Sequence, residues 1–125
     1  MYFFVYGTLK VGGYFAKYLY TYRTTSEVAI LKGFDLHDLR NFPGIVPGLG
    51  EVKGEIHTYM REEAVLREMD RIEGYDEENP TGSLFIRHKG KVTTENGEEV
   101  DAWFYEFNQG LPTGAKKIPD GVWDI

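Results

Sequence analysis

The amino-acid sequence predicts an α+β fold over residues 1–125, a single domain with a mainly antiparallel, barrel-like β-sheet and a few short helices. Three observations predict this class. Predicted strands outnumber predicted helices and do not alternate with them regularly, which points to α+β. The chain contains nine Tyr, eight Phe and 15 Gly, a combination that favours strands and turns over long helices. Its length of 125 residues fits one compact domain.

The first third of the chain predicts a strand, a short helix and a second strand. Residues 2–6 (YFFVY) form an apolar run that ends at Gly7, the pattern of a strand buried on both faces. A second strand is expected over residues 27–39, where Gly33 indicates a bulge or bend. Residues 14–22 predict a short amphipathic helix between them, since four apolar residues recur at helical spacing: Phe15, Tyr18, Leu19 and Tyr22.

The middle of the chain predicts a loop followed by a strand. Residues 40–50 (RNFPGIVPGLG) contain two prolines and three glycines, which predicts a loop. Residues 51–59 (EVKGEIHTY) alternate as a strand does. One face of this strand is expected to carry Val52, Gly54 and Ile56, and the other Lys53, Glu55 and His57.

Residues 62–73 (EEAVLREMDRIE) predict the clearest helix. Acidic residues open it, which suits a helix N-terminus, and Gly74 is placed to cap its C-terminus. Its apolar stripe consists of Val65, Leu66, Met69 and Ile72. An acidic loop with a proline follows over residues 75–82, and two strands flank residues 95–98, where Asn-Gly is a strong hairpin signal. The tail from Leu111 has no predicted structure.

Composition excludes several classes of function. The chain has no Cys, which excludes disulfides, thiolate nucleophiles and Fe–S ligation and suits a cytoplasmic location. A formal net charge of −6 argues against a nucleic-acid partner. No signal peptide and no apolar run near the roughly 18 residues of a spanning helix is visible, so no membrane association is expected. The three histidines, His37, His57 and His88, lack metal-ligand spacing, so no metal site is expected.

The glycine turn after the first strand predicts an anion site. Gly7 and Gly12 have the separation of a phosphate-binding P-loop, but Gly13 and Tyr14 stand where Lys and Ser/Thr are required. The dinucleotide pattern fails as well, because Leu9 occupies the place of its second glycine. Successive free N–H groups bind a carboxylate as well as a phosphate. The alternative interpretation is an ordinary tight turn.

Glu73 is the candidate proton carrier. It follows Leu66 by seven residues and Met69 by four, so it lies on or beside the apolar stripe, in the last helical turn. Partial burial and the negative end of the helix dipole both disfavour its ionised form, which raises the pKa. Such a group can accept and return a proton near neutral pH. The alternative is a boundary glutamate whose stem packs while its carboxylate reaches water.

Asp70 offers a second carboxylate one turn before Glu73. A glycosidase-like mechanism would use the two as acid and nucleophile. We favour instead a pairing of Asp70 with a nearby arginine. Tyr6, Tyr75 and Trp103 are further candidates to line a pocket.

Five segments together resemble the γ-glutamylcyclotransferase-like family, in particular its small branch that includes γ-glutamylamine cyclotransferases. They are FVYGTLKVGG (4–13), PGIVPG (43–48), VKGEIH (52–57), MDRIEGY (69–75) and AWFYEF (102–107). The resemblance covers most of the chain. It implies a mixed fold built around a β-barrel, with a cavity beside the Tyr-Gly-Thr-Leu loop.

The resemblance also implies roles for individual residues. Tyr6, Gly7, Thr8 and Leu9 would bind the α-carboxylate of the substrate and flank its amine, largely through backbone groups. Glu73 would be the catalytic acid/base. Related sequences often have Tyr-x-Arg where this chain has Phe85-Ile86-Arg87. That difference, and the acidic loop 76–82, are expected to bear on specificity.

The expected activity is cyclisation of a γ-glutamyl amine, amide or peptide to 5-oxoproline, with release of the amine or amino acid. The attack is intramolecular, so the reaction needs orientation and one proton carrier, with no cofactor and no metal. One alternative is a binding module that holds a glutamate-like anion in the same cavity without turnover. A third hypothesis, a scaffold protein that assembles through its aromatic surface, predicts no pocket. The sequence does not determine the oligomeric state.

Overall fold

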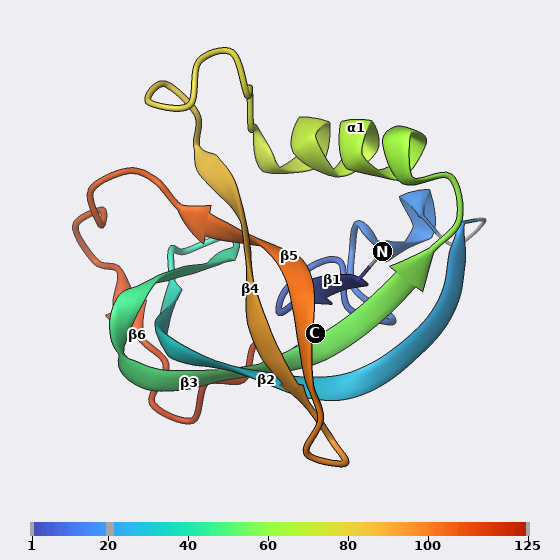
Figure 1. The fold of residues 1–125 in the computed structure, drawn as a ribbon. Helices are drawn as coiled ribbons and strands as arrows, with labels where there is room; N and C mark the ends of the chain where they lie inside the picture. Colours follow the sequence, from blue (N-terminus) through green and yellow to red (C-terminus); the bar gives the residue numbers. More distant parts are fainter. Residues whose placement is uncertain (1, 20–21, 125) are drawn as a thin grey trace.

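A computed structural model describes residues 2–19 and 22–124. Figure 1 shows its elements in the order of the chain. They are β1 (Tyr2–Val5), the 3-10 helix η1 (Ala16–Tyr18), β2 (Arg23–Asp38), β3 (Pro43–Tyr59), α1 (Glu62–Glu73), β4 (Phe85–Thr94), β5 (Glu99–Phe107) and β6 (Lys116–Lys117).

The first five strands close into a barrel. Hydrogen bonding gives the order β3-β1-β5-β4-β2, and β2 pairs back onto β3. Neighbouring strands in this ring are antiparallel except β1 and β5, which meet in parallel at Phe3 and Trp103. The short β6 extends the end of β2 at His37 and Asp38. The predicted α+β fold with a mixed, mainly antiparallel barrel is therefore confirmed.

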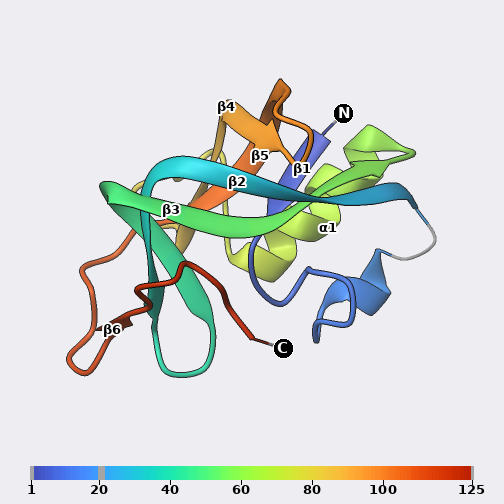
Figure 2. The ribbon, with the colours of Figure 1, turned by 90° about the horizontal axis from the view of Figure 1, so that it is seen from below.

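The helix α1 packs on the side of the barrel opposite the long ribbon formed by β2 and β3 (Figures 1 and 2). Its residues Val65 and Met69 are fully buried, and burial of such a side chain contributes about 1.5–3 kcal/mol. Within residues 2–19 and 22–124, no helix combines the length and the apolar character needed to cross a bilayer.

The strand β1 separates two apolar cores. Phe4 packs in the barrel interior, and Phe3 and Val5 pack with the helix residues on the other side. The expectation of a strand buried on both faces is thus confirmed. Because β1 lies between the barrel interior and α1, the chain that leaves it reaches the C-terminal end of the helix, where the candidate site is found.

Three local predictions are confirmed. The helix α1 has the predicted bounds, and Gly74 caps it in the left-handed region at φ 68°, a conformation that favours glycine. Gly97 lies at φ 86° in the β4–β5 turn. Gly33, at φ 89°, coincides with a shift in the β2–β3 register between Lys32 and Phe34, so the expected bulge is present.

The prediction of a loop over residues 40–50 is wrong, because residues 43–50 form the first half of β3. Proline cannot donate a ladder hydrogen bond, so it enters a strand where one edge is left unpaired. In the part of the chain that the structure describes, Pro43 and Pro47 pair with β2 alone. The proline nitrogens therefore face an edge of β3 where no hydrogen-bond donor is needed. The strand was not predicted because the prolines and glycines of residues 40–50 are typical of a loop.

The predicted helix over residues 14–22 is reduced to the three residues of η1. Successive hydrogen bonds run from residue i to residue i−3, at Ala16, Leu19 and Tyr22, which is 3-10 geometry. Leu19 is buried as expected, and Phe15 and Tyr22 pack against the same core. The side chain of Tyr18 and residues 20–21 lie outside what the structure describes.

Candidate active site

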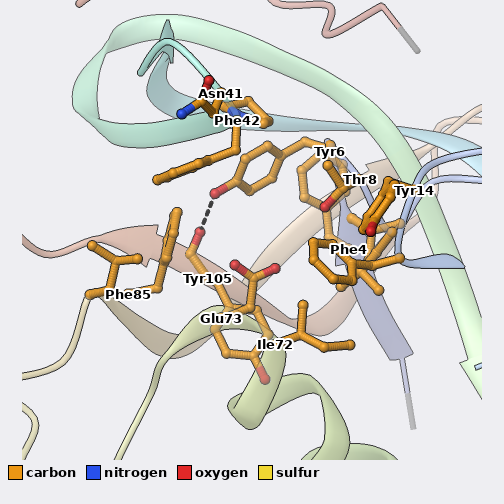
Figure 3. A pocket seen from close by; sticks show the side chains of 16 residues that line it. Phe4, Tyr6, Thr8, Tyr14, Asn41, Phe42, Ile72, Glu73, Phe85 and Tyr105 are labelled. Carbon is orange, nitrogen blue, oxygen red and sulfur yellow. Dashed lines mark hydrogen bonds between the residues drawn. The ribbon is translucent and has the colours of Figure 1, made fainter. Parts of the chain in front are cut away.

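A cavity of about 550 Å³ opens where the end of β1, the C-terminal turn of α1 and the strands β4 and β5 converge. Figure 3 shows the side chains around it. The lining includes all five residues singled out from the sequence: Tyr6, Gly7, Thr8, Leu9 and Glu73. The third hypothesis, which predicts no pocket, is contradicted by this cavity.

The carboxylate of Glu73 points into the cavity (Figure 3). It has no hydrogen-bond or ion-pair partner among the described residues. Burial raises the pKa of this carboxyl from its ordinary 4.5 to about 7. A carboxyl with that pKa exchanges its proton close to neutral pH, which is the property required of a general acid/base.

The loop after β1 lines the same cavity and carries free backbone donors. The N–H groups of Gly7, Thr8 and Leu9 have no acceptor among the described residues, whereas the next N–H, that of Lys10, closes a turn onto the Gly7 carbonyl at 3.0 Å. Three successive free N–H groups form a concavity of positive potential that suits an anion. Gly7 is required for space, since a Cβ there would lie 2.5 Å from Cγ of Pro43.

Gly13 closes the loop, and its carbonyl also accepts the Ala16 N–H at 3.2 Å where η1 begins. A Cβ on Gly13 would lie 2.4 Å from the Thr8 carbonyl oxygen. That carbonyl accepts the N–H of Phe15 at 2.9 Å, and Gly13 donates to Lys10 at 2.7 Å. The chain thus folds back on itself beside the cavity, which fixes the positions of the free donors.

A buried polar cluster anchors this loop to β3. Glu55 accepts the Val11 N–H at 2.9 Å and contacts Nε2 of His57 at 2.8 Å, while Nδ1 of His57 lies 2.7 Å from the Tyr59 hydroxyl. Burial acts to raise the pKa of Glu55, but its hydrogen bonds with His57 and Val11 outweigh burial and lower the pKa. His57 shares a face of β3 with Lys53 and Glu55, as the alternation predicts, and it is 0% exposed where the loop is anchored to that face.

The second carboxylate, Asp70, is fully engaged. Arg87 donates to its two oxygens at 2.9 and 2.7 Å, and the Tyr105 hydroxyl donates to Oδ1 at 2.6 Å. The expected pairing with an arginine is confirmed. Burial raises the pKa of Asp70, and the hydrogen bonds from Tyr105 and Arg87 only partly offset that effect. Asp70 is absent from the cavity lining, so the glycosidase-like dyad is not formed.

The remaining walls are mostly apolar. Phe42, Pro43, Leu84 and Phe85 contribute to these walls, and Pro43 packs against Gly7 of the loop. The position where relatives often have tyrosine, Phe85, is therefore part of the wall, whereas no residue of 76–82 is. Phe42 and Pro43 were not expected in the site, because the glycines and prolines around them predict a loop.

Tyr6 and Tyr105 connect the two sides of the cavity. The hydroxyl of Tyr6 donates to the Tyr105 carbonyl at 2.7 Å, as Figure 3 shows. Burial, and then the charge of Glu73, raise the pKa of Tyr6 well above its ordinary value, so Tyr6 stays neutral at physiological pH. The other two candidate pocket aromatics, Tyr75 and Trp103, do not line this cavity and instead flank Arg87.

Metal ligands are not assembled in the part of the chain that the structure describes, where no group of three or more His, Cys, Asp and Glu side chains could hold an ion. The cavity lining holds one carboxylate, that of Glu73, together with the free backbone donors of the loop and polar side chains such as Thr8 and Asn41. Such an arrangement can fix an anion and move a proton.

Comparison with known proteins assigns the chain to a family. A family described as gamma-glutamyl cyclotransferase, AIG2-like, matches residues 3–125. The solved structure of protein ytfP from Escherichia coli is similar, with 27% identity, a TM-score of 0.67, and coverage of 98% of this chain and 96% of that one. An uncharacterized protein from Pyrococcus horikoshii shows the same fold at 21% identity and a TM-score of 0.65, covering 98% of this chain and 88% of that one.

A structure named gamma-glutamyl cyclotransferase shares the fold at 18% identity and a TM-score of 0.58, over 94% of this chain and 69% of that one. A search of curated protein sequences found no match. Since the family pattern extends over nearly the whole sequence, the chain belongs to the gamma-glutamyl cyclotransferase, AIG2-like family.

Proposed function

We propose that this protein is a cofactor-free γ-glutamylcyclotransferase. It converts a γ-glutamyl amine, amide or peptide into 5-oxoproline and releases the amine or amino acid. The observation that carries this proposal is the placement of the unpartnered Glu73 carboxylate in one cavity with the free N–H groups of Gly7, Thr8 and Leu9. A chain without cysteine also suits a reducing compartment, and we place the reaction in the cytoplasm.

The loop donors hold the α-carboxylate of the substrate, so that the γ-glutamyl chain stays folded with its amine near its own γ-carbonyl. Holding reacting groups in this way supplies a large part of the rate enhancement of an intramolecular reaction. The small-molecule anion is thereby fixed at one end by backbone groups, and its leaving group extends toward the apolar wall of Phe42 and Phe85.

Glu73 carries the proton. Its carboxylate takes a proton from the substrate α-amino group as that nitrogen attacks the γ-carbonyl carbon and the ring C–N bond forms. The same group then gives the proton to the leaving nitrogen as the old amide C–N bond breaks. The products are 5-oxoproline and a free amine, and Glu73 returns to its starting state. A pKa of about 7 suits both transfers.

The test is Glu73→Gln, with release of 5-oxoproline measured over a panel of γ-glutamyl amines, amides and peptides. We expect turnover to fall by about 100- to 10,000-fold, the usual contribution of a general acid/base, while L-glutamate still binds to the loop. Glu68→Gln, on the same helix but in an exposed pair with Arg71, should retain full turnover. Full turnover by Glu73→Gln would exclude Glu73 as the base.

The same panel decides between an enzyme and a binding module. Release of 5-oxoproline from any member of the panel supports the enzyme. Saturable binding of glutamate-like ligands with no turnover of any member would establish the binding module instead.

A further inference from the structure

A cluster of side chains behind the cavity holds the helix end that carries Glu73. Arg87 is its centre and is 10% exposed. One guanidinium nitrogen, Nη1, contacts both oxygens of Asp70, at 2.9 and 2.7 Å. The guanidinium also lies over two aromatic rings, 4.9 Å from the centre of Trp103 and 5.4 Å from that of Tyr75. A planar cation held by a carboxylate and two ring faces has little freedom to move.

Two of the residues that contact Arg87, Asp70 and Tyr75, lie on either side of Glu73 in the sequence. Asp70 precedes Glu73 by one turn, and Tyr75 follows it by two residues. The N–H of Tyr75 also donates to the Asp70 carbonyl at 2.9 Å. The last turn of a helix frays unless its end is held, and here the contacts from Arg87 on β4 reach both sides of the base.

Tyr105 links this cluster to the loop after β1, which is the proposed substrate-binding loop. Its hydroxyl donates to Asp70, and its carbonyl accepts the hydroxyl of Tyr6. One carboxylate on α1 is therefore connected through Tyr105 to the start of the loop. These two hydrogen bonds hold the helix end that carries Glu73 and the start of the loop in a fixed arrangement.

We propose that Arg87 is a positioning residue that fixes the Glu73 carboxylate inside the cavity by clamping the last turn of α1 through Asp70 and Tyr75. Only the kinetic consequence of this clamp rests on the proposed function. When the clamp is weakened, the helix end loosens, water reaches Glu73, and the carboxylate becomes more mobile. The loop donors are anchored separately through Val11 and Glu55, so binding of the α-carboxylate is largely preserved.

The clamp has a signature in the titration of Glu73, because burial alone accounts for its raised pKa. The titratable and charged groups that surround it are Tyr6 and Tyr105 in the cavity and Asp70, Glu77 and Arg87 behind it. Burial raises the pKa of both tyrosines, so neither changes charge near neutrality. A shift of the Glu73 midpoint therefore reports its hydration.

The test compares Arg87→Lys with Lys91→Met. Lysine keeps the charge of Arg87 but loses the planar guanidinium that lies over the rings of Trp103 and Tyr75. Lys91 lies on the same strand in an exposed pair with Asp101, so its substitution removes a cation without touching the clamp. The carboxyl carbon of Glu73 is followed by NMR in protein labelled with ¹³C-glutamate, with Glu73→Gln used to assign the signal. Turnover is measured in parallel.

In Arg87→Lys we expect the midpoint of Glu73 to fall by about one unit toward its ordinary value. We also expect kcat to fall about 10-fold while KM stays within about twofold, since a misplaced group affects the reacting step. Lys91→Met should change neither. If Arg87→Lys is poorly folded by thermal unfolding, Tyr105→Phe makes the same test, because it removes only the hydroxyl that donates to Asp70.

The possible results separate the two proposals. A shifted midpoint in a protein that turns over no γ-glutamyl compound supports the clamp and overturns the proposed function. Normal turnover with an unshifted midpoint in Arg87→Lys and Tyr105→Phe overturns the clamp and leaves the proposed function standing. A variant can also lose activity only in proportion to its unfolded fraction. If the titration midpoint of Glu73 is then unshifted in the folded protein, the clamp is overturned as well.

Discussion

Asp70 and Glu73 stand one helical turn apart on α1, and their carboxylates have opposite surroundings. Asp70 accepts hydrogen bonds from Arg87 and Tyr105. Glu73 points into the cavity (Figure 3) and has no such partner among the described residues. The first carboxylate stabilises the helix end, and the second is available to a ligand. This division lets one helix supply both a structural carboxylate and the proposed proton carrier.

The pH dependence of activity should follow Glu73. The base must be ionised to accept the substrate proton, and its pKa is about 7. We expect kcat/KM to rise with pH and to reach half of its plateau near that value. The measurement is 5-oxoproline release at low substrate concentration across the neutral range. A rise centred near the ordinary value of 4.5 would show that Glu73 is hydrated in solution.

The free energy of unfolding should fall as the pH rises, opposite to the pH dependence of kcat/KM. The pKa of Glu73 is raised in the folded state, so the folded protein holds a proton that the unfolded chain loses between pH 4.5 and about 7. Stability is therefore lost as the pH rises through this window, by up to about 3 kcal/mol. We expect Glu73→Gln to be more stable than the parent above neutrality and equally stable near pH 4.5, as measured by urea unfolding. The exposed Glu95→Gln should show no such crossover.

Gly7→Ala tests the close approach between β3 and the loop after β1. The added Cβ would lie 2.5 Å from Pro43, so the loop must move and its N–H groups are displaced. We expect kcat/KM to fall by about 10-fold or more, since small displacements of binding groups are costly, with the secondary structure retained by circular dichroism. Gly110→Ala is the control, because nothing lies within 4 Å of a Cβ there. Equal kinetics in the two variants would remove the loop from the site.

Glu55→Ala tests the anchor of the same loop. It removes the acceptor of the Val11 N–H and leaves His57 without its carboxylate partner. Loss of one partner of a buried hydrogen bond costs about 1–3 kcal/mol. We expect KM to rise about 10-fold and the amide hydrogen of Val11 to exchange faster by NMR. Glu51→Ala, at an exposed position of β3, should leave both values unchanged.

Phe85→Tyr tests the wall that faces the leaving group. Phe85 is 3% exposed and meets Phe107 edge to face with 5.5 Å between ring centres. A hydroxyl there adds a polar group to an apolar wall and changes which leaving groups fit. We expect the ranking of kcat/KM over the γ-glutamyl panel to change while ring closure continues. Phe34→Tyr, in the barrel core beside Phe104, should leave the ranking intact even if it lowers stability.

Local sequence patterns predict much of the fold. The helix α1, its glycine cap and the β4–β5 hairpin follow from residues that lie within one or two turns of each other, where dihedral preference and amphipathic spacing act directly. The first half of β3 was not readable, because proline and glycine are usual in loops. Whether Pro43 and Pro47 can enter a strand depends on which edge is left unpaired, and that is a property of the assembled barrel.

The same division applies to the site. The sequence by itself singled out Glu73, from its place on the apolar stripe in the last turn, and the Tyr-Gly-Thr-Leu loop, from glycine spacing and family resemblance. Only the tertiary structure brought them to one cavity, bound Asp70 to Arg87, and buried His57 beneath the loop. Local sequence records which residues suit a turn or a helix face. The partner of each carboxylate was decided by contacts between segments far apart in the chain, because hydrogen bonding and burial depend on which strands the barrel makes neighbours.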